Sequence, residues 1–230
     1  MKTKFAVIVF PGSNCDHDAY YALKKTIDVD VEFVWHRETN LRDHSAILIP
    51  GGFSYGDYLR TGAIARFSPI MRSVIDSAKK GKPVIGICNG FQILIEAGLL
   101  PGALLRNKYL KFICKNVFVK INNTENEYFK NIKQNILELH IAHNEGNYYC
   151  SDQELKSIND NNQIAINYCN KKGDILEESN PNGSISNIAG IFNKEKNILG
   201  MMPHPERMID SYLSGKDGSI FFENLIGNLK

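Results

Sequence analysis

Cys88 stands in the segment of this sequence that is best suited to nucleophilic chemistry. It is the centre of the G-x-C-x-G pattern GICNG, between an apolar strand expected over Pro83–Ile87 and a helix expected over Asn89–Ala97. The two glycines allow the sharp, strained turn of a nucleophile elbow, which presents a side chain at the carboxyl end of a sheet. The start of a helix also favours a thiolate over a thiol. A buried structural cysteine with packing glycines is the alternative, and the pattern favours a nucleophile.

His204 is the best candidate for a base that activates this thiol. Pro203 and Pro205 flank it, and each proline biases the residue before it to extended geometry. Side chains two residues apart on an extended chain face the same side, so His204 and Glu206 are expected to point together. A carboxylate that orients an imidazole is the second half of a catalytic triad. A structural histidine in a proline-rich turn is the simpler alternative.

A glycine-rich turn, PGG at 50–52, follows another expected strand over Ala46–Ile49. Its backbone N–H groups could approach a substrate closely enough to form an oxyanion hole. No G-x-x-x-x-G-K-[ST] pattern occurs in the chain, so a phosphate-binding loop of that type is not expected. Cys15 is a rival nucleophile because it also lies between a strand and a helix, but it lacks the flanking glycines.

Near-continuous apolar strands alternate with helices in the N-terminal half of the chain. The expected strands are Lys4–Phe10, Val31–His36, Ala46–Ile49 and Pro83–Ile87, and the expected helices are Asp16–Thr26, Ala65–Lys80 and Asn89–Ala97. Apolar strands of this kind predict an α/β fold with a mostly parallel central sheet and helices on both faces. Open sheets of this type bind ligands at the carboxyl ends of their strands, where the turns with Gly52 and Cys88 lie.

The C-terminal half adds shorter strands, expected over Phe112–Ile121, Ile136–Ala142, Ile164–Tyr168, Ile188–Phe192 and Ile198–Met202. Polar residues fill 122–135 and 151–163, which predicts solvated loops and a short helix. Apolar residues at helical spacing predict a closing helix over Asp217–Leu229. With no internal repeat, low-complexity tract or linker, residues 1–230 are expected to form a single domain.

The composition is that of an ordinary globular protein, with 43% hydrophobic and 23% charged residues and a formal net charge of +2. Such a charge favours neither nucleic acid nor an anionic membrane as a partner, and no apolar run reaches the ~20 residues of a membrane span. The five cysteines form no CxxC pair and the six histidines no familiar ligand cluster. We therefore expect no disulfides, no metal site and a reducing compartment such as the cytoplasm.

Several motifs together resemble the class I, or triad, glutamine amidotransferases: GICNGFQ at 86–92, PGGFSYGDYLR at 50–60, MPHPER at 202–207 and NPNGS at 180–184. GICNGFQ is typical of the whole family. SYGDYLR, NPNGS and PGSNCD at 11–16 resemble, within that family, the small glutaminase subunits of phosphoribosylformylglycinamidine synthases, which act in de novo purine synthesis. The resemblance runs from Phe5 to the final helix and implies a flavodoxin-like fold.

The resemblance implies a role for each site residue. Cys88 attacks the side-chain amide of glutamine, His204 assists, and Glu206 lies behind His204. Backbone N–H groups of Gly52 and Asn89 stabilise the oxyanion, and side chains or backbone of four further residues help to hold glutamine: Gln92, Asn182, Gly183 and Ser184. Ammonia leaves, a γ-glutamyl thioester remains on Cys88, and water releases glutamate.

The resemblance also implies partners. Ammonia passes to a separate synthetase subunit, which uses ATP and Mg, and a small accessory subunit completes the complex; no cofactor is expected in this chain. A glutaminase subunit of another glutamine-dependent synthetase, or a non-catalytic glutamine-binding subunit, is the alternative. The basic stretch at 106–111 is either a partner surface or a solvated loop.

One position departs from the family pattern. This chain has HNEG at 143–146 where the family usually has HGEG. Asparagine tolerates left-handed backbone geometry better than most residues, so the turn is expected to survive. Any close backbone contact at Asn144 is in doubt.

Overall fold

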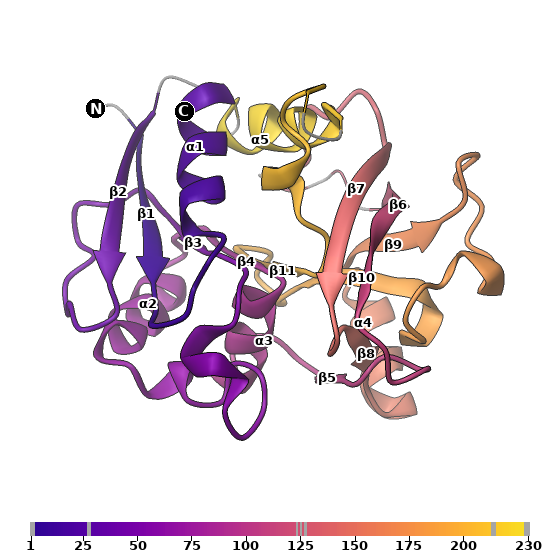
Figure 1. Cartoon of the computed structure of the whole chain (residues 1–230), viewed down its shortest axis with the longest axis horizontal. Helices are drawn as coiled ribbons and strands as arrows, with labels where there is room; N and C mark the ends of the chain where they lie inside the picture. Colours follow the sequence, from indigo (N-terminus) through magenta and orange to yellow (C-terminus); the bar gives the residue numbers. More distant parts are fainter. Residues whose placement is uncertain are drawn as a thin grey trace.

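The computed structural model of the chain describes residues 3–26, 29–122, 124, 126, 128–212 and 215–227. Within these residues, nine strands form one sheet in the order β2-β1-β3-β4-β11-β10-β9-β6-β7 (Figure 1). The strands from β2 to β11 in this order are parallel to one another, and β10, β9, β6 and β7 continue the sheet with antiparallel pairing. The α/β fold with additional strands in the C-terminal half is confirmed.

The strands of this sheet lie where the sequence predicts them, to within one residue at each end. Their bounds are β1 Lys4–Val9, β2 Asp30–Trp35, β3 Ala46–Ile49, β4 Val84–Ile87, β6 Ile113–Ile121, β7 Ile136–His143, β9 Ile164–Cys169, β10 Ile188–Phe192 and β11 Ile198–Met201. A separate pair, β5 Ala103–Leu105 with β8 Asn147–Tyr149, was not predicted. Strands of three residues are too short to show a hydrophobic period.

The α-helices are α1 Asp16–Thr26, α2 Pro69–Lys79, α3 Asn89–Glu96, α4 Asp152–Asp160 and α5 Asp217–Gly227. The helix expected over Ala65–Lys80 is wrong at its start, because Ser68 is extended and α2 begins at Pro69. A residue before proline avoids helical geometry, and proline suits the first helical position. Ala65–Phe67 instead forms a separate 3₁₀ turn. The end of the helix expected to Leu229 lies outside the described residues.

The expectation of a purely solvated segment over 122–135 is wrong. Tyr128 and Phe129 are buried, and their rings lie 5.5 Å from Phe192 and 5.9 Å from Phe221, respectively, between centroids. The Tyr128 hydroxyl also donates a hydrogen bond to the Val84 carbonyl at 3.2 Å. This segment therefore fastens α5 and the antiparallel strands to the start of β4. In the other polar segment, the expected short helix is α4.

The order of the strands explains why the candidate residues meet. From β1 the chain continues to β2, its neighbour in one direction along the sheet, and from β3 it continues to β4, its neighbour in the opposite direction. Because both crossovers are right-handed, α1 and α2 lie on opposite faces of the sheet. Ligands bind where the strand order reverses in this way. Each candidate residue follows one of the parallel strands: Cys15 follows β1, Gly52 follows β3, Cys88 follows β4 and His204 follows β11. All four therefore lie at the carboxyl ends of these strands. No helix among the described residues is long and apolar enough to cross a lipid bilayer.

Candidate active site

Cys88 occupies a strained turn between β4 and α3. Its backbone has φ 49° and ψ −105°, a conformation that residues with a side chain rarely adopt. The Cys88 N–H donates to the Met201 carbonyl at 2.7 Å, so β11 holds the turn. A Cβ added at Gly90 would lie 2.0 Å from the Ile49 carbonyl oxygen, and one at Gly86 would lie 2.6 Å from the Gly90 backbone. The turn has the geometry predicted for a nucleophile elbow, and it needs both glycines.

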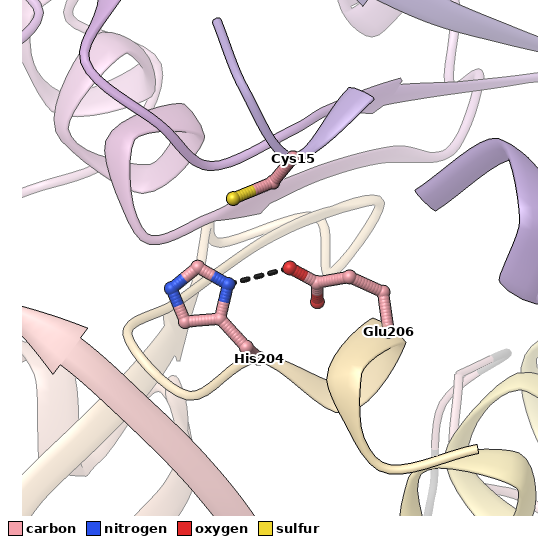
Figure 2. Close-up of side chains that lie close together, drawn as sticks. All are labelled: Cys15, His204 and Glu206. Carbon is pink, nitrogen blue, oxygen red and sulfur yellow. Dashed lines mark hydrogen bonds and ion pairs between the residues drawn. The ribbon is translucent and has the colours of Figure 1, made fainter. Parts of the chain in front are cut away.

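His204 and Glu206 point toward each other, as the flanking prolines predict (Figure 2). The His204 Nδ1 and Glu206 Oε1 atoms are 2.5 Å apart, and both side chains are buried. The carboxylate accepts the Nδ1 proton, which leaves the lone pair on Nε2. The His204 Nε2 atom is buried and has no hydrogen-bond partner among the described residues. It is therefore free to accept a proton from a reacting group.

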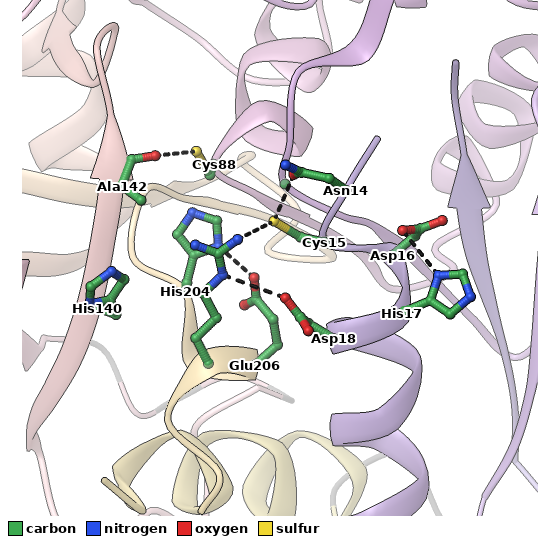
Figure 3. Close-up of polar contacts among 12 residues, drawn as sticks. Asn14, Cys15, Asp16, His17, Asp18, Cys88, His140, Ala142, His204 and Glu206 are labelled. Carbon is green, nitrogen blue, oxygen red and sulfur yellow. Dashed lines mark hydrogen bonds and ion pairs between the residues drawn. The ribbon is translucent and has the colours of Figure 1, made fainter. Parts of the chain in front are cut away.

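The surroundings of His204 strengthen it as a base. Burial lowers the pKa of His204, but Glu206, and after it the Cys88 and Cys15 sulfurs, raise it by more. The pKa of the imidazole therefore lies well above its ordinary value, which increases its affinity for the thiol proton of Cys88. Cys88 lies at the same strand ends as His204 (Figure 3), and its sulfur donates only weakly, to the Ala142 carbonyl at 3.8 Å.

Cys15 lies beside the same His204–Glu206 pair (Figure 2). Its sulfur accepts a hydrogen bond from Arg207 Nη2 at 3.0 Å, and its S–H donates to Asn14 Oδ1 at 3.4 Å (Figure 3). Arg207 is held in turn by Asp18, with Nε and Oδ2 3.5 Å apart. The Cys15 sulfur is thus buried and engaged on two sides, which leaves it poorly placed to attack a substrate.

The sulfur of Cys15 also forms part of a group of metal-type ligands. One ligand atom each of Cys15, His204 and Glu206 lies within 4.8 Å of the other two, and no other such group occurs among the described residues. Sulfur, nitrogen and oxygen together suit Zn²⁺. The guanidinium of Arg207 on the sulfur disfavours a second positive charge. The prediction that the chain has no metal site therefore stays a prediction.

Two backbone N–H groups were expected to stabilise an oxyanion. Gly52 has φ 126°, and a Cβ there would lie 2.6 Å from the Asn14 nitrogen, so only glycine fits. Asn89 is the first residue of α3, where backbone N–H groups have no acceptor within the helix. Its side-chain Oδ1 accepts from the Ser54 N–H at 3.2 Å. This bond joins the loop after β3 to the turn that carries Cys88.

The residues expected to hold glutamine meet around the loop 143–146. Gln92 Nε2 donates to the Glu145 carbonyl at 2.6 Å, and Asn182 Nδ2 donates to the Gly146 carbonyl at 2.8 Å. The Ser184 hydroxyl reaches the same Gly146 oxygen at 3.3 Å. These three side chains already bond to the protein, so they shape the loop beside the thiol. Gly183 lies between Asn182 and Ser184 and has a positive φ of 91°.

The turn at 143–146 is present as expected, but the reason given for its tolerance of Asn144 is wrong. Asn144 does not have a positive φ, so the turn needs no left-handed residue at that position. The loop is stabilised instead by Asn107, whose N–H donates to the Asn144 carbonyl at 2.9 Å. Asn107 Nδ2 also donates to the His143 carbonyl at 2.9 Å, so its Oδ1 accepts from His143 Nδ1 at 3.0 Å. Burial, with His204 nearby, lowers the pKa of His143 to about 3, so this ring stays neutral.

Two contacts and one pKa shift in the site were not foreseen. Arg207 engages Cys15, although its place directly after Glu206 in MPHPER was a usable signal. Thr61 donates to Glu145 Oε2 at 2.9 Å. Burial, and then the neighbouring Glu145, raise the pKa of Asp57 to about 6. The carboxyl group of Asp57 thus lies near that of Glu145, which belongs to the loop that Gln92 holds.

Comparisons with known proteins agree with this geometry. Residues 2–216 match the family of CobB/CobQ-like glutamine amidotransferase domains. A protein of Pelagibacter ubique named phosphoribosylformylglycinamidine synthase subunit PurQ is 64% identical over 225 residues, which are 98% of this chain and 99% of that protein.

Solved structures show the same fold. A chain in the structure of PurLQS from Thermotoga maritima has a TM-score of 0.88 and 39% identity, with 100% of both chains covered. A putative GMP synthase component from Thermoplasma acidophilum has a TM-score of 0.64 at 18% identity, over 100% of this chain and 94% of the other, and supports the fold alone. A family match over nearly the whole length settles the affiliation: this chain belongs to the CobB/CobQ-like glutamine amidotransferases.

Proposed function

We infer that this chain is the glutaminase subunit of a phosphoribosylformylglycinamidine synthase, the enzyme that makes phosphoribosylformylglycinamidine in purine biosynthesis. The relative that shares 64% of its residues carries that name over the same length. The observation that carries the chemistry is the Cys88 elbow beside the buried His204–Glu206 pair. The subunit hydrolyses glutamine and supplies ammonia for the synthetase reaction.

We propose that the reaction proceeds through a thioester on Cys88. His204 Nε2 takes the thiol proton, and the sulfur attacks the side-chain amide carbon of glutamine. Backbone N–H groups of Gly52 and Asn89 stabilise the oxyanion that forms. His204 then gives its proton to the departing nitrogen, and ammonia leaves. Water, activated by the same imidazole, attacks the thioester, which releases glutamate and restores the thiol.

Glu206 has a supporting role in this mechanism. Its carboxylate accepts the Nδ1 proton of His204 and therefore keeps the lone pair on Nε2, the nitrogen that has no other partner among the described residues. The negative charge also stabilises the imidazolium that forms in each half-reaction. Gln92, Asn182 and Ser184 hold carbonyl groups of the loop 143–146, and together with Gly183 they help to hold glutamine.

The partners follow from the same assignment. The solved relative is part of an assembly described as PurLQS, and we assign two partners to this chain, the synthetase subunit and the small accessory subunit. We propose that the synthetase subunit uses ATP and Mg and that this chain carries no cofactor. Residues 1–230 then act as one amidotransferase domain, since a single sheet joins strands from Lys4 to Met201. All five cysteines are free, which suits the cytoplasm.

Two nitrogen sources test this function in a reconstituted complex. Cys88→Ala should abolish synthesis of phosphoribosylformylglycinamidine from glutamine and leave synthesis from ammonium salt intact, because the synthetase chemistry lies in another chain. We propose that the oxyanion donor at Gly52 is misaligned in the isolated subunit, which should therefore hydrolyse glutamine slowly, since loss of one such donor costs ~10²–10³ in rate. Equal loss with both nitrogen sources would show that Cys88 supports assembly and not ammonia release.

A further inference from the structure

Two tripeptides of the same type lie exposed on the surface. Tyr58-Leu59-Arg60 follows β3, and Tyr109-Leu110-Lys111 lies between β5 and β6. Tyr58 and Leu59 are 74% and 85% exposed, and Tyr109 and Leu110 are 69% and 70% exposed. Each pair thus presents an aromatic and a branched apolar side chain to solvent, next to a basic residue.

The backbone at both leucines is left-handed. Leu59 has φ 69° and Leu110 has φ 55°, in a region where glycine and asparagine are favoured and a branched residue is not. The turns themselves explain these angles, since the Leu110 N–H closes a turn onto the Asn107 carbonyl at 2.8 Å. They do not explain the choice of leucine, because neither side chain is buried. The fold of this chain gives no reason for leucine at either position.

Both tripeptides border the proposed glutamine site. The loop of Leu59 is joined to α3 by the bond from Ser54 to Asn89, and Gly62 at its end packs directly on the backbone of Gln92. The loop of Leu110 is joined to the other side of the site, because the Lys108 N–H donates to the Asn182 carbonyl at 2.8 Å. The two tripeptides therefore belong to loops that are tied to two different groups of proposed site residues, α3 with Gln92 and the turn with Asn182.

We propose that these two tripeptides form the docking surface for the synthetase subunit, with Leu59 and Leu110 inserted into apolar pockets of that partner. The proposal rests on the proposed function, because ammonia released at Cys88 has to reach the synthetase without loss to solvent. The partner must therefore cover the rim of the glutamine site, where both leucines lie. Tyrosine is enriched among the residues that dominate binding energy.

Charge indicates what the partner presents around those pockets. Arg60 is already paired with Glu96 through two bonds of 2.7 Å. Arg106 and Lys108, near the second leucine, keep exposed side chains, with only distant pairings of 3.9 Å to Glu145 and 3.6 Å to Glu177, respectively. The segment 106–111, which contains the second tripeptide, thus carries three basic side chains, which fits carboxylates on the face of the synthetase that receives Leu110.

Asparagine at each leucine separates docking from folding. Leu59→Asn and Leu110→Asn suit the left-handed backbone, so the midpoint of thermal unfolding of the isolated chain should stay the same or rise. Affinity for the synthetase subunit, measured by titration with nucleotide and the accessory subunit present, should fall about tenfold for each variant, because each loses the burial of one leucine side chain in the partner. A structural role for either leucine would not give these opposite changes.

Tyr212→Ser is the matched control. Tyr212 is 96% exposed and lies two residues after Asp210. Asp210 pairs with Lys25 in the last turn of α1, whereas the first turn of that helix lies at the site. This control should bind the synthetase as the wild type does. The ammonium-driven reaction of the synthetase should be unchanged throughout.

Three results would overturn the docking surface. Wild-type affinity in both asparagine variants would remove it while leaving the nitrogen-source experiment, and thus the proposed function, intact. Weakened binding of only the accessory subunit, or of a second copy of this chain, would assign the tripeptides to a different partner. Failure of the wild-type chain itself to bind the synthetase would remove both the docking surface and the assembly in the proposed function.

Discussion

Two junctions in this protein have the same plan, a parallel strand that leads through a cysteine into a helix. β1 leads through Cys15 into α1, and β4 leads through Cys88 into α3. Both cysteines lie at the carboxyl ends of the parallel strands, and both raise the pKa of His204. Only the second junction has the left-handed backbone of an elbow at its cysteine.

The residues two positions away from each cysteine account for the difference. Cys15 lies between Ser13 and His17, whereas Cys88 lies between Gly86 and Gly90. The glycines let α3 approach β3 so closely that no Cβ fits at Gly90, and this approach turns the cysteine out at the strand end. A strand, a cysteine and a helix therefore do not suffice for a nucleophile elbow. The Cys88 junction differs from the Cys15 junction in the tight packing of α3 against β3.

The largest expected effect tests which neighbour His204 depends on. Glu206→Gln should lower glutamine hydrolysis in the assembled complex by ~10²–10⁴, because the wrong imidazole tautomer becomes available. Cys15→Ser should cost less than about tenfold, because the sulfur engages Arg207 and not the substrate. Steady-state kinetics of glutamine hydrolysis measure the loss of rate in each variant. A larger loss in Cys15→Ser would reverse the roles assigned to the two junctions.

The next effect is on stability. Gly90→Ala should destabilise the fold by ~3 kcal/mol or more, since its Cβ would meet the Ile49 carbonyl at 2.0 Å. The corresponding change at the other junction, His17→Ala, should stay within ~0.5 kcal/mol because His17 is exposed. Urea unfolding of both variants measures the difference. Equal stability would mean that α3 can shift away from β3 without cost.

A smaller effect separates the thiols by reactivity. A glutamine-like alkylating agent should modify Cys88 at least about tenfold faster than Cys15, because we propose that such a reagent binds beside Cys88, and the Cys15 sulfur is already hydrogen-bonded to Arg207 and Asn14. Mass mapping of the labelled peptides over time gives both rates. Cys15 labelled first in the wild type would make it the nucleophile.

The smallest effect concerns pH. Neighbours that raise the pKa of His204 keep its proton bound to higher pH, so removing one of them must move the limb of kcat/KM that reports His204 to lower pH. Cys15→Ala should shift this limb by less than about one pH unit, and Glu206→Gln should shift it further, because Glu206 is the stronger of the two influences. Profiles of kcat/KM against pH, measured on the assembled complex, show which variant shifts the limb further. An unshifted limb in Glu206→Gln would assign that limb to another group.

The sequence predicts the parts of this structure that depend on neighbours along the chain. The strand ends, the elbow at Cys88 and the pairing of His204 with Glu206 follow from apolar runs, glycines and prolines within a few residues. Contacts between distant segments do not follow in this way. Arg207 engages Cys15, 192 positions away, and the burial of Tyr128 depends on β4 and β10. Two adjacent aromatic residues in a polar segment were nonetheless a signal.

The place of β11 between β4 and β10 has a consequence for how the protein forms. Val84 pairs with Ile198, so β4 is made long before its neighbour emerges from the ribosome. Until then its backbone N–H and C=O groups form an open edge, which can pair with the strands of other chains. Pairing between such distant segments is also slow. Insertion of β11 closes that edge and brings His204 to the strand ends where Cys88 lies, so the proposed catalytic pair forms only in chains in which β4 no longer has an open edge.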